Sequence, residues 1–189
     1  MQQGKPLFTV RRLALDAMLV AVYIVLGFLK IPIGNLLRIN LASFSVVVCA
    51  IVFSPIDGLV VGFLGEFLSQ VLGPYGLTPT TLLWVLPEAV RGLLLGCIML
   101  GFTKKYSLSQ LIKSKSMVAF LAACIVTGVV ASLLNTFALY VDSKMFGYYS
   151  YYMVFGVLAV RLGLAVVMSG MFGFVALHIA ADLRRNKIV

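Results

Sequence analysis

The chain has 189 residues, of which 62% are hydrophobic and only 11% are charged. This balance excludes an ordinary soluble domain and indicates an integral membrane protein. The formal net charge of +9 does not indicate nucleic-acid binding, because the basic residues lie in short clusters between apolar runs. Those runs have helical length and none alternates as a barrel strand does, so we predict an all-α membrane protein.

Six apolar segments are predicted to cross the membrane, and no repeat or linker divides them, so residues 1–189 should form a single transmembrane substrate-binding domain. The predicted spans are residues 13–29, 40–54, 56–73, 80–102, 117–141 and 152–180. Basic clusters at Arg11 and Arg12, at Lys104 and Lys105, and at the C-terminal end then fall on one side of the membrane. The positive-inside rule makes that side the cytoplasm, so both termini are expected to be cytoplasmic.

The third predicted span contains several glycines, which permit close helix approach, and then Glu66 and Gln70 one turn apart on one face. A turn with two prolines follows, and Thr80 at its end can cap the next helix or contact a ligand.

The stretch GPYGLTPTTLLWVLPEAVRG leads from this turn into the fourth span, where Glu88 and Arg91 lie three residues apart and therefore on one side of a helix. Ionised groups inside a membrane segment are costly, so their default interpretation is functional. The structural alternative is that the glutamates pair with the arginines only to reduce the insertion cost and to fix helix register.

Polar side chains from four predicted spans fall in the same outer half of the membrane. They are Glu66, Gln70, Glu88, Arg91, Asn135 and Arg161. Groups at this depth should face a wet cavity, which predicts a ligand pocket. Asn35, Arg38, Thr80 and Trp84 are expected to complete it from the external side, together with tyrosines near residues 140–152, although anchoring at the membrane interface also explains the aromatic residues.

Motifs for chemistry are missing from the sequence. It contains no GxxxxGK[ST] phosphate loop, no GxSxG elbow and no HExxH pair. We therefore predict a transport subunit rather than an enzyme, with no catalytic residue, no cofactor and no metal.

Three pieces of the sequence, in this order, resemble the S components of energy-coupling factor (ECF) vitamin transporters. They are the first helix ALDAMLVAVYIVLG with its Ala17-x-x-x-Ala21 spacing, the span SPIDGLVVGFLGEFLSQ and the turn YGLTPTTLLW. The resemblance covers essentially the whole chain. It implies a multi-pass subunit of the bacterial cytoplasmic membrane that binds a small-molecule vitamin with high affinity at its external face.

The resemblance also implies partners besides membrane lipid: a transmembrane T component and two cytoplasmic ATPase subunits. The docking surface for these partners would be the small residues of the first helix, Ala14, Ala17 and Ala21. Residues 30–40 and 73–81 would act as gates over the pocket.

The substrate is predicted from the charged residues of the pocket. Two arginines suit a carboxylate, and the remaining polar side chains suit hydroxyl or amide groups, so pantothenate is the best single prediction. Hydroxymethylpyrimidine and pyridoxine are alternatives, because Glu66 and Glu88 can pair with an aminopyrimidine. Folate is less favoured, because the folate-type turn before the fourth helix is replaced here. Alternatives of another class are a stand-alone secondary transporter and a purely structural membrane subunit.

Overall fold

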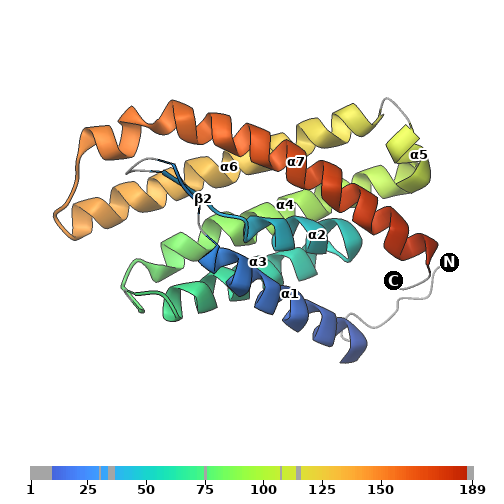
Figure 1. The fold of residues 1–189 in the computed structure, drawn as a ribbon, viewed down its shortest axis with the longest axis horizontal. Helices are drawn as coiled ribbons and strands as arrows, with labels where there is room; N and C mark the ends of the chain where they lie inside the picture. Colours follow the sequence, from blue (N-terminus) through green and yellow to red (C-terminus); the bar gives the residue numbers. More distant parts are fainter. Residues whose placement is uncertain are drawn as a thin grey trace.

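A bundle of helices dominates the computed structural model, which describes residues 10–29, 31–33, 37–74, 76–106, 108–113 and 116–186 (Figure 1). Its helices are α1 (Val10–Phe28), α2 (Ser43–Val52), α3 (Pro55–Val71), α4 (Thr81–Lys105), α5 (Leu108–Lys113), α6 (Ser116–Met145), the π-helical turn η1 (Tyr152–Gly156) and α7 (Leu158–Arg185). Strands β1 (Ile31–Ile33) and β2 (Leu37–Ile39) form an antiparallel hairpin between α1 and α2.

Each predicted span contains one helix of the bundle, but the six helices differ in length. Among the described residues, three helical stretches are long and apolar enough to cross a membrane: Thr81–Lys105, Ser116–Met145 and Tyr152–Leu183. The second predicted span, residues 40–54, contains only the 10 residues of α2. The hairpin was not predicted, and it adds a small β element to the all-α class.

The two ends of the bundle differ in what they carry. In Figure 1 the start of α1, the end of α7 and α5 lie at one end, while the turn between α3 and α4 and the turn between α6 and η1 lie at the other. Helix α4 packs against α2, α3 and α6, and α6 packs along α7. Helix α1 packs against α2 and α3 at the edge of the bundle.

Glycines bring the backbones of α3 and α4 into direct contact, as the sequence predicted. A Cβ added at Gly62 would lie 2.5 Å from the Glu88 carbonyl oxygen, and one at Gly92 would overlap the Gly58 carbonyl oxygen. Only residues without a side chain allow this approach. The contact places the C-terminal half of α3, with Glu66, beside the N-terminal half of α4.

Helix α2 lies in the centre of the bundle, in contact with α1, α3, α4 and α7. Eight of its residues are buried, and Val46, Val47, Cys49 and Ile51 are at most 1% exposed. At about 1.5 Å per residue, 10 residues extend only about 15 Å. Helix α2 therefore begins inside the bundle, and Ser43, its first residue, lines a cavity between the helices.

Candidate ligand-binding cavity

A cavity of about 510 Å³ opens between α2, α3, α4, α6 and α7. This volume lies in the range of pockets that hold small molecules. The lining residues are Asn40, Ser43, Glu66, Gln70, Trp84, Pro87, Glu88, Arg91, Gly128, Ala131, Ser132, Asn135, Thr136, Leu139, Arg161, Leu164, Ala165, Met168, Ser169 and Phe172. Two acidic and two basic side chains face one space, so their formal charges balance.

The structure brings seven of the ten predicted binding residues to this cavity: Glu66, Gln70, Trp84, Glu88, Arg91, Asn135 and Arg161. Thr80 does not line it, because its hydroxyl is buried and donates to Asp142 on α6. Asn35 lies outside the described residues, and so does the side chain of Arg38, whose backbone belongs to β2. The structure thus brings these seven side chains to one cavity.

Glu66 is held on both of its carboxylate oxygens. The hydroxyl of Tyr23 on α1 donates to Oε2 at 2.6 Å, and the Gln70 amide, one turn along α3, donates to Oε1 at 2.8 Å. The predicted proximity of Glu66 and Gln70 is thereby confirmed. These bonds fix the carboxylate at the cavity wall in one orientation.

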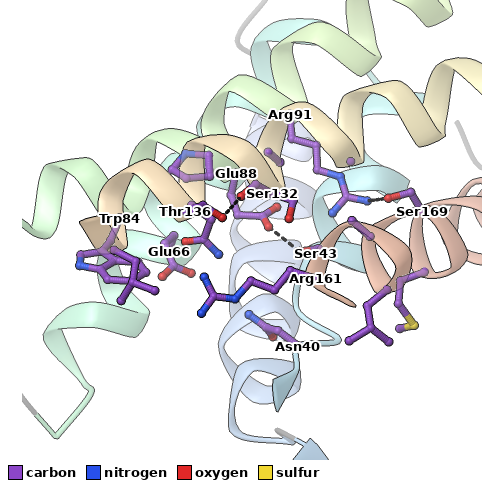
Figure 2. A pocket seen from close by; sticks show the side chains of 18 of the residues that line it. Asn40, Ser43, Glu66, Trp84, Glu88, Arg91, Ser132, Thr136, Arg161 and Ser169 are labelled. Atoms are coloured by element: carbon purple, nitrogen blue, oxygen red, sulfur yellow. Dashed lines mark hydrogen bonds between the residues drawn. The ribbon is translucent and has the colours of Figure 1, made fainter. Parts of the chain in front are cut away.

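Glu88 and Arg91 have neutral partners (Figure 2). The Ser43 hydroxyl donates to Glu88 Oε1, and an Arg91 terminal nitrogen donates to the Ser169 hydroxyl at 3.0 Å. Within the described part of the chain, Glu88 Oε2 and Arg91 Nε are buried without a hydrogen-bond partner, and no ion pair joins the two residues. A guanidinium that is 7% exposed is therefore matched by a hydroxyl rather than by a carboxylate.

Arg161 reaches the cavity from the first turn of α7. One of its terminal nitrogens donates to the Met153 carbonyl oxygen in η1 at 2.9 Å. In Figure 2 its guanidinium extends into the space between Glu66 and Asn40. Figure 2 also shows Trp84 at one end of the group and the Arg91–Ser169 pair at the other. About seven residues of helix separate Trp84 from Arg91, or roughly 10 Å along α4.

Sequence reasoning missed the small and neutral part of the cavity wall. On α6, Gly128, Ser132 and Thr136 follow one another at a spacing of four residues and therefore share a face. Asn40 and Ser43 come from the entry to α2, and Ser169 comes from α7. The four-residue spacing on α6 could have indicated these residues from the sequence. No sequence feature distinguishes Ser43 and Ser169 from serines that only pack between helices.

Several features that the sequence placed near the pocket lie elsewhere. Tyr140, Tyr148, Tyr149, Tyr151 and Tyr152 are not among the residues that line the cavity. Tyr148 instead donates to Asp142, the buried acid that also accepts from Thr80. Among the described residues, no group of three or more His, Cys, Asp or Glu is placed to hold a metal ion.

The alanines predicted to dock a partner lie on the outer face of α1. Ala14, Ala17 and Ala21 are all exposed, and Asp16, Val20 and Tyr23 form the opposite, buried face. None of the cavity-lining residues belongs to α1. The outer face of α1 is thus open to a partner and separate from the cavity.

The fold and the cavity together define a helical membrane protein with a polar, ligand-sized site inside its bundle. The chain belongs to the family described as "ECF-type riboflavin transporter, S component", which it matches over residues 7–185. No individually curated protein matches the chain. Membership makes the protein a membrane-embedded, multi-pass transport subunit rather than an enzyme, and it implies a vitamin ligand and association with a T component and ATPase subunits.

Proposed function

We propose that this protein is the high-affinity vitamin-binding subunit of an ATP-driven ECF importer, and that the cavity between α2 and α7 holds the vitamin. The single observation that carries the proposal is the state of Arg91. A buried guanidinium with one neutral acceptor in the described structure is costly, and an acceptor group on a ligand would offset that cost.

Riboflavin is the first candidate ligand. Support comes from the description of the family and from the balanced charges of the cavity, which suit a neutral molecule. The flat ring system of riboflavin offers carbonyl oxygens to an arginine, and its ribityl chain offers hydroxyls to the serine, threonine and amide side chains. Trp84 provides an aromatic surface for stacking at the far end from Arg91.

Pantothenate is the second candidate, and the two arginines favour it. Arg91 and Arg161 have a hydroxyl and a backbone carbonyl as their hydrogen-bond acceptors, so either could take the carboxylate of a small acid. The carboxylates of Glu66 and Glu88 in the same cavity argue against a further anion. Hydroxymethylpyrimidine, pyridoxine and folate complete the panel to be tested.

The proposed topology of the protein has six membrane crossings and both termini in the cytoplasm. The start of α1 and the end of α7 lie at the end of the bundle that carries α5, near the lysines at the end of α4 (Figure 1). An even number of crossings requires this arrangement, and the basic clusters favour the cytoplasm for that side. The cavity then opens toward the outside, as uptake requires.

The experiment is to purify the protein alone in detergent and identify small molecules released from it by mass spectrometry. Titration with riboflavin, followed by flavin fluorescence, and with the rest of the panel, followed by calorimetry, comes next. We expect one vitamin to bind at a one-to-one ratio. If no member of the panel is bound or released, the binding-subunit proposal fails and a structural subunit becomes the better interpretation.

A further inference from the structure

Tyr23 is a buried residue of α1 whose hydroxyl reaches the wall of the cavity. Its side chain is 0% exposed, and the hydroxyl donates to Glu66 Oε2 at 2.6 Å. Hydrogen bonds to an ionised group are the stronger kind, and the buried Tyr23 hydroxyl has no access to water as an alternative partner. Tyr23 therefore limits where the Glu66 carboxylate can point.

The position of the Tyr23 ring is itself fixed by α3. A Cβ added at Gly65 would lie 2.7 Å from Cγ of the ring, so the ring packs directly on the α3 backbone one residue before Glu66. Val20, Ala42, Val46 and Val61 belong to the same buried cluster. A ring packed this tightly has no room to rotate away, which makes it a rigid support for the hydroxyl.

The bond from Tyr23 to Glu66 joins α1 directly to a residue of the cavity wall. The side chain of Arg12, near the start of α1, pairs with Asp57 and Ser54 at the start of α3, far along both helices from the cavity. Side chains of α1 thus bond to α3 at two places, through Arg12 and through Tyr23. Only the Tyr23 bond, of these two, reaches a residue that lines the cavity.

We propose that Tyr23 is a positioning residue, which holds Glu66 in its ligand-binding orientation and thereby links the position of α1 to occupancy of the cavity. The inference rests on the proposed function, because it needs a ligand in the cavity. Linkage is reciprocal: a force on α1 that moves Tyr23 changes ligand affinity, and a bound ligand restrains α1. Any partner that binds the exposed alanines of α1 therefore acts on the site through Tyr23.

A double-mutant cycle on ligand affinity tests the proposal. Tyr23→Phe keeps the ring and removes the hydroxyl, and we expect riboflavin, or whichever panel vitamin the wild type binds, to bind roughly ten-fold more weakly. In a Glu66→Ala background the same change should have almost no further effect, because the group that Tyr23 positions is gone. Tyr152→Phe is the matched control, since Tyr152 is 65% exposed and should leave affinity unchanged.

A second measurement separates positioning from mere packing. Ligand binding should slow hydrogen exchange of α1 backbone amides near Tyr23 in the wild type, and this protection should be lost in Tyr23→Phe.

The outcomes are distinguishable from failure of the proposed function. If the wild type binds a vitamin and Tyr23→Phe binds it equally well, or if Tyr23→Phe weakens binding to the same extent with and without Glu66, the positioning proposal is overturned. If the wild type binds no vitamin of the panel, the proposed function fails and the proposal about Tyr23 fails with it.

Discussion

At Gly128, α6 comes so close to α7 that there is no space for a side chain. A methyl group there would overlap the Ser169 hydroxyl and lie 2.8 Å from Ser169 Cβ. The same hydroxyl accepts the hydrogen bond from Arg91. Gly128 therefore leaves the space in which Ser169 faces α6 and accepts the hydrogen bond from the buried guanidinium.

Gly128→Ala is expected to weaken vitamin binding by roughly ten-fold or more, because loss of a hydrogen bond to a charged group is worth about 1.5–3 kcal/mol. Overpacking between α6 and α7 should also lower the thermal denaturation midpoint in detergent. Gly163→Ala is the matched control on α7, since a Cβ there meets nothing within 4 Å. Unchanged affinity in Gly128→Ala would show that Ser169 does not support Arg91.

The charged residues of the site, together with Gln70, Trp84 and Asn135, could be predicted from the sequence, whereas its small neutral residues could not. Glu66, Glu88 and Arg91 stand out because an ionisable group in an apolar run has few structural explanations. Ser169 and Gly128 resemble ordinary small residues at a helix contact, and only the fold shows that they share a wall with Arg91.

At the level of elements, a buried hydrogen-bond group joins the turn before α4 to the end of α6. Asp142, which is 9% exposed, accepts from the Thr80 hydroxyl and from Tyr148 beyond the end of α6. Thr80 in turn accepts the Trp84 backbone N–H in the first turn of α4. The group thus fixes the start of the helix that carries Trp84 into the cavity.

Asp142→Ala should reduce the free energy of unfolding by about 1–3 kcal/mol, the cost of leaving a buried polar partner unsatisfied. Because Trp84 lies one turn beyond Thr80, faster vitamin dissociation is expected as well, measured by stopped-flow fluorescence or by dilution. Asp182→Ala is the control, since Asp182 is an exposed acid on α7. An Asp142→Ala protein with wild-type stability would rule out this role for the hydrogen-bond group.

The long helices were predictable as elements because each corresponds to an apolar run of sufficient length. Their ends were less predictable: the fourth span was predicted to end at residue 102, and α4 continues through Lys104 and Lys105. The second run, residues 40–54, gave the largest error. Only residues 43–52 of this run are helical, because the chain enters α2 from a hairpin at the edge of the cavity, and hydropathy carries no information about a cavity.

At the scale of the whole molecule, the bundle separates two surfaces. The cavity is enclosed by α2, α3, α4, α6 and α7, while α1 stands at the edge with its alanines outward and Tyr23 inward. A subunit that binds a ligand and also docks on a transport module needs this separation, because the partner must not block the site. The resemblance implied an outward face on the first helix, but the inward reach of Tyr23 to the cavity wall is a property of the three-dimensional arrangement.

Ala17→Phe is expected to abolish vitamin uptake by cells that contain the complete transporter, while the purified variant binds its vitamin with wild-type affinity. A bulky ring on the exposed face of α1 prevents close approach of a partner helix and leaves the buried face of α1 unchanged. Val167→Phe is the control, because Val167 is 58% exposed on α7, away from the alanine face, and should transport normally. Uptake and binding are measured with the same labelled vitamin. Loss of binding in Ala17→Phe would contradict the separation of the two surfaces, and normal uptake would show that α1 does not dock through this face.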